Sequence, residues 1–428
     1  MSRKRLAADI VILSTGKVLS TGLRVGLIPI ISRIYLPEQW GIAALFVSLV
    51  GIVVPIGILS FPQAVVLPDH EQEAAGLAFL SFCTTLGFSL LLWAGLGLCD
   101  YFSISVYPQL DVWIWLLPLG VVLQGWIQGC EGWLTRKRGF VLSSMGDVIQ
   151  TGVTSGMRVG VGYLSGPLMW PLIFSVLAGQ GLRLLAYGHH VIAIIRAAMT
   201  LGGAGLRDLL SRYRRFPLYN MPGALLFAFN AQVPLLALSY LFSPYETGQY
   251  AMVNGILVMA LMLLGESVRR GYLHHATESH RNGQALRKPY LMMTGLLWLA
   301  AVGPVLLVLF YGQELFTFIL GEKWAQAGVY AAALMPWLLM QWTAVPASAL
   351  VITLRRQRFW FYFQQSLLIA QLGGMALGYL LLGKDALSLL WGYSLARSVM
   401  LMGLILYIAL ISSGTAIRTR PRAEEVGI

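Results

Sequence analysis

Twelve long apolar segments run through this chain of 428 residues and limit the folds open to it. A helix needs about 20 apolar residues to cross the ~30 Å hydrocarbon core of a bilayer. Segments of this kind fall at residues 8–32, 41–62, 75–98, 112–134, 140–164, 168–190, 217–242, 248–268, 290–312, 327–352, 360–382 and 386–411. Only 11% of the residues are charged, too few to cover a water-facing surface. The pattern predicts an all-α polytopic membrane protein with about twelve transmembrane helices.

The distribution of Lys and Arg between the predicted loops indicates the topology. With the N-terminus inside, 22 basic residues fall in inside loops and termini, and three fall outside, at Arg33, Lys323 and Lys384. Such a bias follows the positive-inside rule and places both termini in the cytoplasm. It also accounts for the net charge of +12 without nucleic acid as a partner. We read the first segment as an uncleaved span and not as a signal peptide.

The longest inside loop, at about 191–216, divides the chain near its middle. Leu206, Leu209, Leu210 and Tyr213 recur there at helical spacing among several arginines. This pattern predicts a basic helix that lies on the inner leaflet and links two six-span halves, residues 1–205 and 206–428.

A short motif occurs at equivalent places in the two halves. Pro37 to Gly41 follows the first span and Pro244 to Gly248 follows the seventh, and both read Pro-x-x-x-Gly. Two ordinary turns would give the same letters, since Pro and Gly are common in loops. A true repeat, six spans apart, would relate the halves by an axis along the membrane normal.

Five basic residues fall inside predicted spans: Lys17, Arg24, Arg158, Arg183 and Arg397. Each costs about 2.5–3.5 kcal/mol at the centre of a membrane helix. They must therefore face water, a partner charge or a ligand. Because basic residues outnumber acids in the spans, the set favours an anionic ligand such as a phosphorylated lipid. We predict all five as substrate-binding residues.

The predicted fifth span carries a polar stripe that includes Asp147 and Arg158. An acid inside a membrane is the usual handle for a coupling ion, so Asp147 is a candidate for that role. An internal salt bridge to a neighbouring Arg explains the same spacing. The span also carries Gly152, Gly156 and Gly160, which predict a face for close helix packing. For Glu131, near an inner helix end, a solvated carboxylate is the simpler interpretation.

Signatures of catalysis and metal binding do not occur in the sequence. There is no P-loop, no Gly-x-Ser-x-Gly elbow and no zinc motif. The three cysteines lack metal or disulfide spacing. We therefore predict neither an enzyme, nor a cofactor, nor a metal site.

The loop Ser32-Arg-Ile-Tyr-Leu-Pro-Glu-Gln-Trp-Gly41, the stretch Ala64 to Ala74 and the turn Leu320 to Ala325 carry a family resemblance. On these segments the chain resembles the multidrug/oligosaccharidyl-lipid/polysaccharide exporter superfamily, and within it the Wzx-type O-antigen flippases. The resemblance implies two six-helix lobes around a central cavity. It also implies transport of an undecaprenyl-pyrophosphate-type oligosaccharide from the inner to the outer leaflet of a bacterial plasma membrane. Membrane lipids and the polysaccharide polymerase machinery would be its other partners.

Two other functions remain open from the sequence. An O-antigen polymerase or ligase needs a sizeable outer loop, and the predicted outer loops are short. A drug exporter of the same superfamily would bind cations, so it should have buried carboxylates in excess, and the opposite is seen. Both features favour the flippase.

Overall fold

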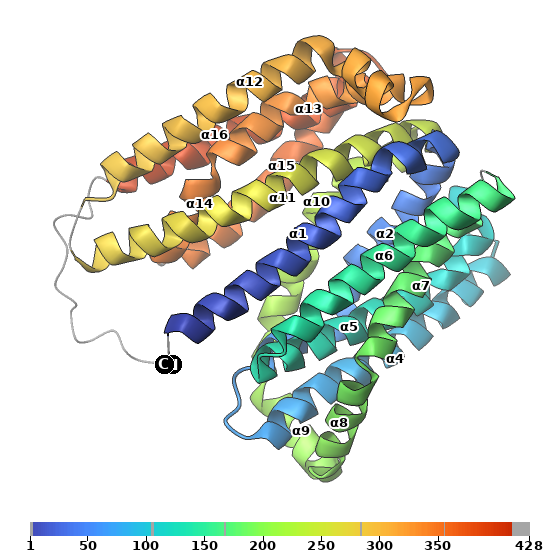
Figure 1. The fold of residues 1–428 in the computed structure, drawn as a ribbon, viewed down its shortest axis with the longest axis vertical. Coiled ribbons are helices and arrows are strands. Elements are labelled where there is room, and N and C mark those ends of the chain that lie inside the picture. Colours follow the sequence, from blue (N-terminus) through green and yellow to red (C-terminus); the bar gives the residue numbers. More distant parts are fainter. Residues whose placement is uncertain (1–2, 104–106, 167, 283–284, 355, 413–428) are drawn as a thin grey trace. The chain divides into compact units, whose positions relative to one another are not determined.

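The computed structural model describes residues 3–103, 107–166, 168–282, 285–354 and 356–412, and these are almost entirely helical, with no strand among them (Figure 1). The α-helices are α1 (Arg3–Ile34), α2 (Pro37–Ile58), α3 (Phe61–Ala64), α4 (Glu71–Tyr101), α5 (Leu117–Lys137), α6 (Phe140–Ser165), α7 (Trp170–Ala186), α8 (Gly188–Met199), α9 (Gly202–Arg212), α10 (Met221–Leu241), α11 (Pro244–Arg281), α12 (Arg287–Leu320), α13 (Ala325–Thr343), α14 (Val345–Thr353), α15 (Gln357–Leu381) and α16 (Ala386–Ile411). Short 3₁₀ or π segments are η1 (Pro108–Leu116), η2 (Phe216–Asn220) and η3 (Glu322–Trp324). Each of the twelve predicted spans is helical, so the all-α membrane class is confirmed.

Length and hydropathy single out the most apolar helices. Among the described residues, six helical stretches are long and apolar enough to cross a membrane, or up to eight if each bent pair of helices is one span. The predicted spans that lie outside this set fall on α1, α6, α7, α11 and α15. Helices α1 and α6 carry the predicted polar stripes, and α7 is apolar but has only 17 residues.

Proline and glycine mark several helix boundaries. Helices α2, α5 and α7 have proline in the first turn, where a missing N–H costs nothing. Helix α6 ends at Gly166 and α12 ends before Gly321, and both glycines have positive φ values, 79° and 101°. A left-handed residue at these points ends the helix and turns the chain.

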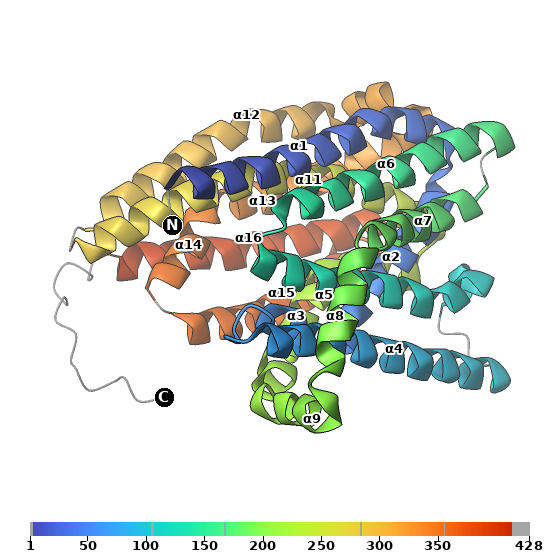
Figure 2. The ribbon, with the colours of Figure 1, turned by 60° about the horizontal axis from the view of Figure 1, so that its bottom comes forward.

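The chain divides into two compact units. Unit 1 comprises Met1–Ala251 with Ile319–Trp324, and unit 2 comprises Met252–Phe318 with Ala325–Ile428. Unit 1 holds α1 to α10, and unit 2 holds most of α11 and α12 with α13 to α16 (Figures 1 and 2). The division into two six-span halves at residue 205 stays a prediction.

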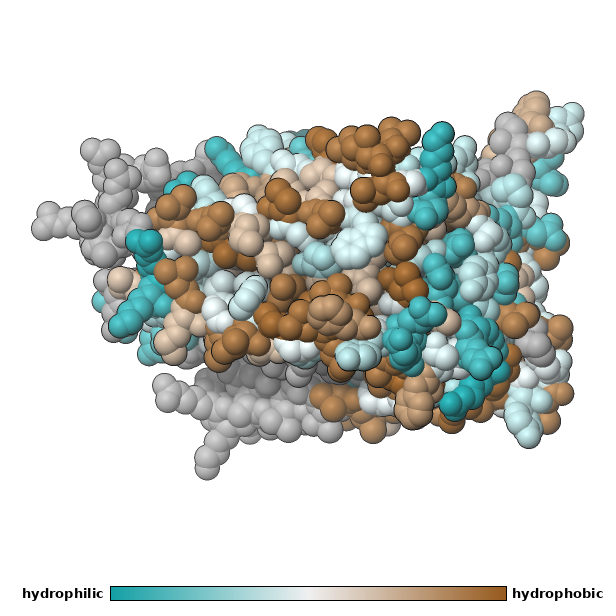
Figure 3. All heavy atoms as spheres, turned by 90° about the horizontal axis from the view of Figure 1, so that it is seen from above, coloured by the Kyte–Doolittle hydropathy of each residue, from teal (hydrophilic) through white to brown (hydrophobic). Residues whose placement is uncertain are grey.

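Large apolar side chains are exposed on many helices. Leu91, Leu164 and Phe318 have 71%, 87% and 82% of their surface exposed. Figure 3 shows apolar side chains over much of the face in view, with hydrophilic ones gathered mostly toward one end. This is the surface that a bilayer covers, because exposed apolar area of this extent is not found on a soluble monomer.

The helix predicted to lie on the inner leaflet exists, but protein covers part of its apolar face: Leu209 is 1% exposed, whereas Leu210 is 39% exposed. Helices α8 and α9 occupy this stretch and bend by 99° at their junction. Leu209 is buried in the core that α4, α5 and α8 also form. Gly76 of α4 leaves the space that Leu209 and Leu206 fill. The prediction that this face rests on lipid is therefore wrong for Leu209, which packs on α4 instead.

One salt bridge fastens the same helix to α4, and a second lies within α9. Arg212 Nη1 contacts Glu73 Oε1 at 3.1 Å, and its Nη2 contacts Asp208 Oδ2 at 2.6 Å. The Asp208 carboxylate, through its hydrogen bond and its charge, and then the Glu73 carboxylate in the same way, hold the pKa of Arg212 above its usual range. The end of α9 is thereby tied to the start of α4.

Candidate functional site

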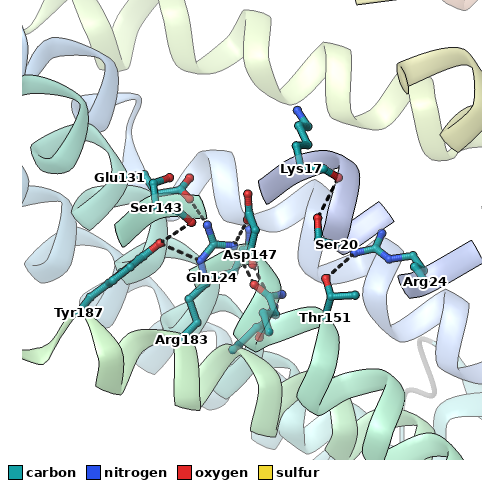
Figure 4. A network of polar contacts seen from close by, with 12 residues as sticks. Lys17, Ser20, Arg24, Gln124, Glu131, Ser143, Asp147, Thr151, Arg183 and Tyr187 are labelled. Carbon is teal, nitrogen blue, oxygen red and sulfur yellow. Dashed lines mark hydrogen bonds and ion pairs between the residues drawn. The ribbon is translucent and has the colours of Figure 1, made fainter. Parts of the chain in front are cut away.

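Helices α1 and α6 run parallel to each other in unit 1 and bring the two predicted polar stripes together (Figures 1 and 4). A Cβ on Gly16 of α1 would touch Ser144 of α6, so the helices are close at this level. About two turns further along, Arg24 Nη2 donates to Thr151 Oγ1 at 3.5 Å. Sequence reasoning placed these polar residues on two stripes, and the structure makes one interface of them.

Lys17 and Arg24 present their side chains on the exposed side of α1. Seven residues apart, they lie on the same helix face, about 10 Å from each other along the axis. Neither forms an ion pair with a carboxylate of the described residues. Figure 4 shows both on the same helix as Ser20, with Arg24 turned toward Thr151. Arg24 is close enough to feel the charge of Asp147, and Lys17 that of Glu131, but neither cation is in direct contact with a carboxylate, so both can receive an anionic ligand.

Arg183 of α7 is the centre of a buried polar cluster, and its side chain is 9% exposed (Figure 4). Its Nη1 lies 2.7 Å from Asp147 Oδ1 and donates to Gln150 Oε1 at 2.8 Å. Its Nη2 contacts the Glu131 carboxylate, and its Nε donates to the Tyr187 hydroxyl at 3.2 Å. The guanidinium therefore has little capacity left for a ligand. The internal salt bridge considered for Asp147 is present, with Arg183 as its partner.

Glu131 is a candidate site residue that sequence reasoning missed. Its carboxylate, 37% exposed, contacts Arg183 beside Asp147, so it is not simply a solvated group at a helix end. The available signal was an acid within an apolar span, which requires a partner. Two carboxylates on one guanidinium leave this cluster with a net charge of −1 when all three are ionised.

Arg158 lies toward the other end of α6 and is held by uncharged groups. Its Nε donates to Ser175 Oγ at 3.1 Å and its Nη2 to the Leu172 carbonyl at 3.4 Å. The guanidinium lies 5.1 Å from the centre of the Trp40 ring. Tyr35 donates to the Arg158 carbonyl at 2.8 Å. No ion pair of Arg158 is found in the described part of the chain, so its charge is balanced only by dipoles and the aromatic ring.

Arg397 belongs to unit 2 and has its own surroundings. It lies on α16, where its Nη1 donates to Gln371 Oε1 at 3.0 Å and to the Tyr393 hydroxyl at 3.2 Å. Its guanidinium carbon lies 5.1 Å from the centre of the Trp337 ring. The structure thus brings four of the five predicted residues to the α1, α6 and α7 region, and Arg397 to a separate aromatic site.

The glycine face predicted for α6 does not serve close packing. No atom of the described chain comes within 4 Å of a Cβ placed on Gly156 or Gly160, and at Gly152 the nearest is a Leu23 methyl at 4.0 Å. That prediction is wrong. Close approach occurs instead at Gly146, against Tyr187 and Arg183, and at Gly162, against Tyr35. These two glycines let the partners of the polar stripe reach α6.

Two surface pockets of unit 1 lie apart from the predicted residues. One, of about 410 Å³, is apolar and lies between α5, α7 and α8. The other, of about 580 Å³, lies between α1 and α6 near Arg33 and Tyr163. Within the described ranges no group of three His, Cys, Asp or Glu residues could hold a metal ion.

Comparison with known families and structures gives one family match. A family model described as "Polysaccharide biosynthesis protein" matches residues 30–328. No curated protein matches the chain.

Solved structures share the fold at low sequence identity. An inward-facing multidrug resistance MATE family transporter of the MOP superfamily is 13% identical, with a TM-score of 0.69, covering 95% of this chain and 96% of its own. The lipid II flippase MurJ, in an inward closed conformation, is 11% identical, with a TM-score of 0.68, covering 95% and 90%. A MOP superfamily transporter from Pyrococcus furiosus, described as having a binding pocket of reverse polarity, is 12% identical, with a TM-score of 0.60, covering 95% and 96%. These likenesses concern the fold.

Proposed function

Because the chain belongs to the polysaccharide biosynthesis protein family of the multidrug/oligosaccharidyl-lipid/polysaccharide exporter superfamily, we propose that it is a flippase for a lipid-linked oligosaccharide. Its substrate in this proposal is an oligosaccharide on an undecaprenyl-pyrophosphate-type carrier, an O-antigen or related surface polysaccharide unit, moved from the inner to the outer leaflet. The chain is a multi-pass membrane transporter and not an enzyme.

The observation that carries the proposal is the charge arrangement along α1. Lys17 and Arg24 share one exposed helix face and form no direct ion pair in the described residues, whereas both nearby acids are in contact with Arg183. The three cations Lys17, Arg24 and Arg183 thus outnumber the two acids Asp147 and Glu131. Unit 1 therefore offers surplus positive charge where a membrane-embedded diphosphate needs it. An Arg fork and a Lys point charge two turns apart on one helix face can together bind the two phosphates of one group.

The same arrangement argues against the two alternatives. A drug exporter for cations needs a carboxylate that is free to bind its substrate, and Asp147 and Glu131 are both paired with Arg183. A polymerase or ligase needs a large loop outside. On the side predicted as outside, only two residues separate α1 from α2 and α10 from α11, and four separate α15 from α16.

Transport in this proposal follows alternating access, with both termini in the cytoplasm of a bacterial cell. The diphosphate and sugars pass through the protein while the polyprenyl tail stays in lipid, because each CH₂ exposed to water costs about 0.8 kcal/mol. Outside, the polysaccharide polymerase machinery would consume the product.

Flipping of a fluorescent lipid-linked oligosaccharide in proteoliposomes tests the proposal. We expect Arg24→Ala to reduce the rate at least tenfold and Arg24→Lys to keep a measurable part of it, because Lys keeps the charge but not the fork. Val25→Ala is the matched control, since Val25 is the adjacent exposed residue on α1. Equal rates for Arg24→Ala and Val25→Ala would overturn the role of Arg24.

We extend the proposal to energy coupling through Asp147. Asp147 and Glu131 compete for one guanidinium, so a proton or sodium ion bound to either would loosen the cluster. Flipping is measured with and without an imposed gradient, for wild type and Asp147→Asn. We expect the gradient to accelerate only the wild type. An equal effect on both proteins would make the carboxylate structural.

A further inference from the structure

An apolar groove on the surface of unit 1, of about 410 Å³, lies between α5, α7 and α8. Its walls are apolar side chains and glycines, among them Leu123, Trp126, Gly181, Leu184, Gly188 and Ile192. No atom of the described chain comes within 4 Å of a Cβ placed on Gly181 or Gly188, so the space that a side chain would fill there is open. In a bilayer an unfilled groove forfeits dispersion contacts, and lipid chains are the groups at hand to supply them.

The groove faces away from the predicted substrate residues. Gly181 and Leu184 lie about 160° and 100° around α7 from Arg183, whose side chain points toward Asp147 on α6. A lipid in the groove would therefore lie on the other side of α7 from the polar stripes of α1 and α6. An inference about this lipid does not rest on the proposed function.

Basic side chains lie along the α8 edge of the groove. Arg196 is exposed one turn beyond the wall residue Ile192, and the exposed His189 lies on the same side of the helix. Arg196 forms no ion pair within the described ranges, whereas Lys137, at the end of α5, is paired with Glu71 at 2.5 Å. An apolar groove that leads to an available guanidinium is complementary to an anionic headgroup with an apolar chain attached.

We propose that the groove binds one anionic phospholipid of the inner leaflet, with an acyl chain against Trp126 and Gly181 and the phosphate beside Arg196. Helix α8 leads from α7 to α9, at the end of unit 1 predicted to face the cytoplasm (Figures 1 and 2). The cytoplasmic leaflet is the one with a negative surface potential. A phosphodiester offers Arg196 two oxygens, and the groove receives the chain that free phosphate lacks.

Titration of the purified full chain with phosphatidylglycerol, followed by native mass spectrometry, tests the headgroup. Phosphatidylcholine with the same acyl chains is the neutral probe. We expect the wild type to bind the first phosphatidylglycerol about fivefold more tightly, the effect of one basic residue beside an anionic lipid. Arg196→Gln should bind the two lipids equally. Arg207→Gln is the matched control and should keep the preference, since Arg207 is exposed on α9, which bends from α8 by 99°.

Filling the groove tests the place of the acyl chain. Gly181→Leu puts a side chain into the open space and should weaken binding of both lipids about tenfold, because the acyl chain loses its contacts there. Gly87→Leu is the matched control, since Gly87 of α4 has equally open surroundings. Gly188→Leu repeats the test from α8 if Gly181→Leu melts below the wild type.

Three results would overturn the site. Equal binding of the two lipids by the wild type would remove the anionic headgroup. Binding that neither Gly181→Leu nor Gly188→Leu weakens relative to Gly87→Leu would show that the lipid lies elsewhere. Undecaprenyl phosphate that binds more tightly than phosphatidylglycerol, and loses this advantage in Gly181→Leu, would assign the groove to a polyprenyl carrier and not to a phospholipid.

Discussion

Gly41 and Gly248 pack against each other reciprocally in unit 1. A Cβ on Gly41 would overlap the carbonyl oxygen of Pro244, and a Cβ on Gly248 would overlap the carbonyl oxygen of Pro37. Each glycine ends one of the two Pro-x-x-x-Gly turns, so each turn fits against the start of the other. Two copies of one motif related by a local two-fold axis would give this contact, whereas unrelated turns would not require it.

We predict that Gly41→Ala lowers the free energy of unfolding by about 1–3 kcal/mol, because the two backbones must separate to admit the methyl group. Gly51→Ala is the matched control on the same helix, where nothing lies within 4 Å of the added Cβ. That change should be neutral or stabilise by up to about 1 kcal/mol through helix propensity. Thermal melting of the purified protein in detergent measures both. Equal melting temperatures for Gly41→Ala and Gly51→Ala would contradict the close contact between Gly41 and Pro244.

We predict that Arg183→Met destabilises the chain by about 3–5 kcal/mol, because it leaves Glu131 and Asp147 without their cation. The triple variant Arg183→Met, Glu131→Gln, Asp147→Asn removes all three charges and should recover much of that loss. Denaturant unfolding of the single and triple variants gives the comparison. If the triple variant is less stable than the single one, the carboxylates contribute independently of Arg183.

The helical membrane fold could be predicted from the sequence because the length of an apolar segment is a local property. Partners across helices are not local. Asp147 pairs with Arg183, 36 residues away on α7, and nothing in the spacing along α6 distinguishes this partner from Arg158. The sequence predicted correctly that α9 has an apolar face. Either lipid or another helix could cover such a face, and only the fold shows that Leu209 packs beside Gly76 of α4.

The candidate site could also be predicted only in part, because contacts between helices are not a local property of the sequence. Charges inside spans identified Lys17, Arg24 and Arg158 as unusual, and none of them forms a direct ion pair in the described residues. Periodicity also placed three glycines on one face of α6, yet close packing occurs at Gly146 and Gly162. Which glycines are needed depends on where a bulky neighbour lies, and that is a tertiary property.

We predict a pH-dependent contribution from Asp385, the N-cap of α16. Hydrogen bonds from the Ser388 side chain and backbone N–H, the latter 2.8 Å from Oδ1, hold the pKa of Asp385 below its usual value. A lowered pKa in the folded state means that the stabilisation is complete above the unfolded pKa, about 3.9, and is lost as the pH falls through the folded value.

Asp385→Ala should therefore lower the free energy of unfolding by about 0.5–2 kcal/mol at pH 7. Below about pH 4 the difference in this free energy between wild type and variant should become smaller. Asp385→Asn keeps a capping oxygen and should lose less at pH 7. Melting curves of the three proteins between pH 8 and pH 3 measure this. A gap between wild type and Asp385→Ala that stays constant over the whole range would show that the carboxylate charge plays no part.

The turn that holds Trp324 gives the last prediction. Trp324 is fully buried in unit 1 and donates from Nε1 to the Ser32 carbonyl at 2.8 Å, while Ser32 Oγ donates to the Leu320 carbonyl at 3.0 Å. The helices on either side of this turn, α12 up to Phe318 and α13 from Ala325, belong to unit 2. The hydrogen bond from the Trp324 indole thus attaches the segment Ile319–Trp324 to α1, although the residues before and after this segment belong to unit 2.

We predict that Trp324→Phe destabilises the protein by about 1–3 kcal/mol, because the Ser32 carbonyl loses its buried donor and water cannot replace it. Trp93→Phe is the matched control. The Trp93 indole also donates to a backbone carbonyl, that of Trp115 at 3.2 Å, but the side chain is 52% exposed. Loss of the Trp93 hydrogen bond should lower the free energy of unfolding by less than about 1 kcal/mol, since the exposed Trp115 carbonyl can accept from another donor. Hydrogen exchange should also rise at residues 319–324 in Trp324→Phe and not in Trp93→Phe. Equal melting temperatures with unchanged exchange at this turn would mean that packing of the ring, and not its N–H, holds the segment on α1.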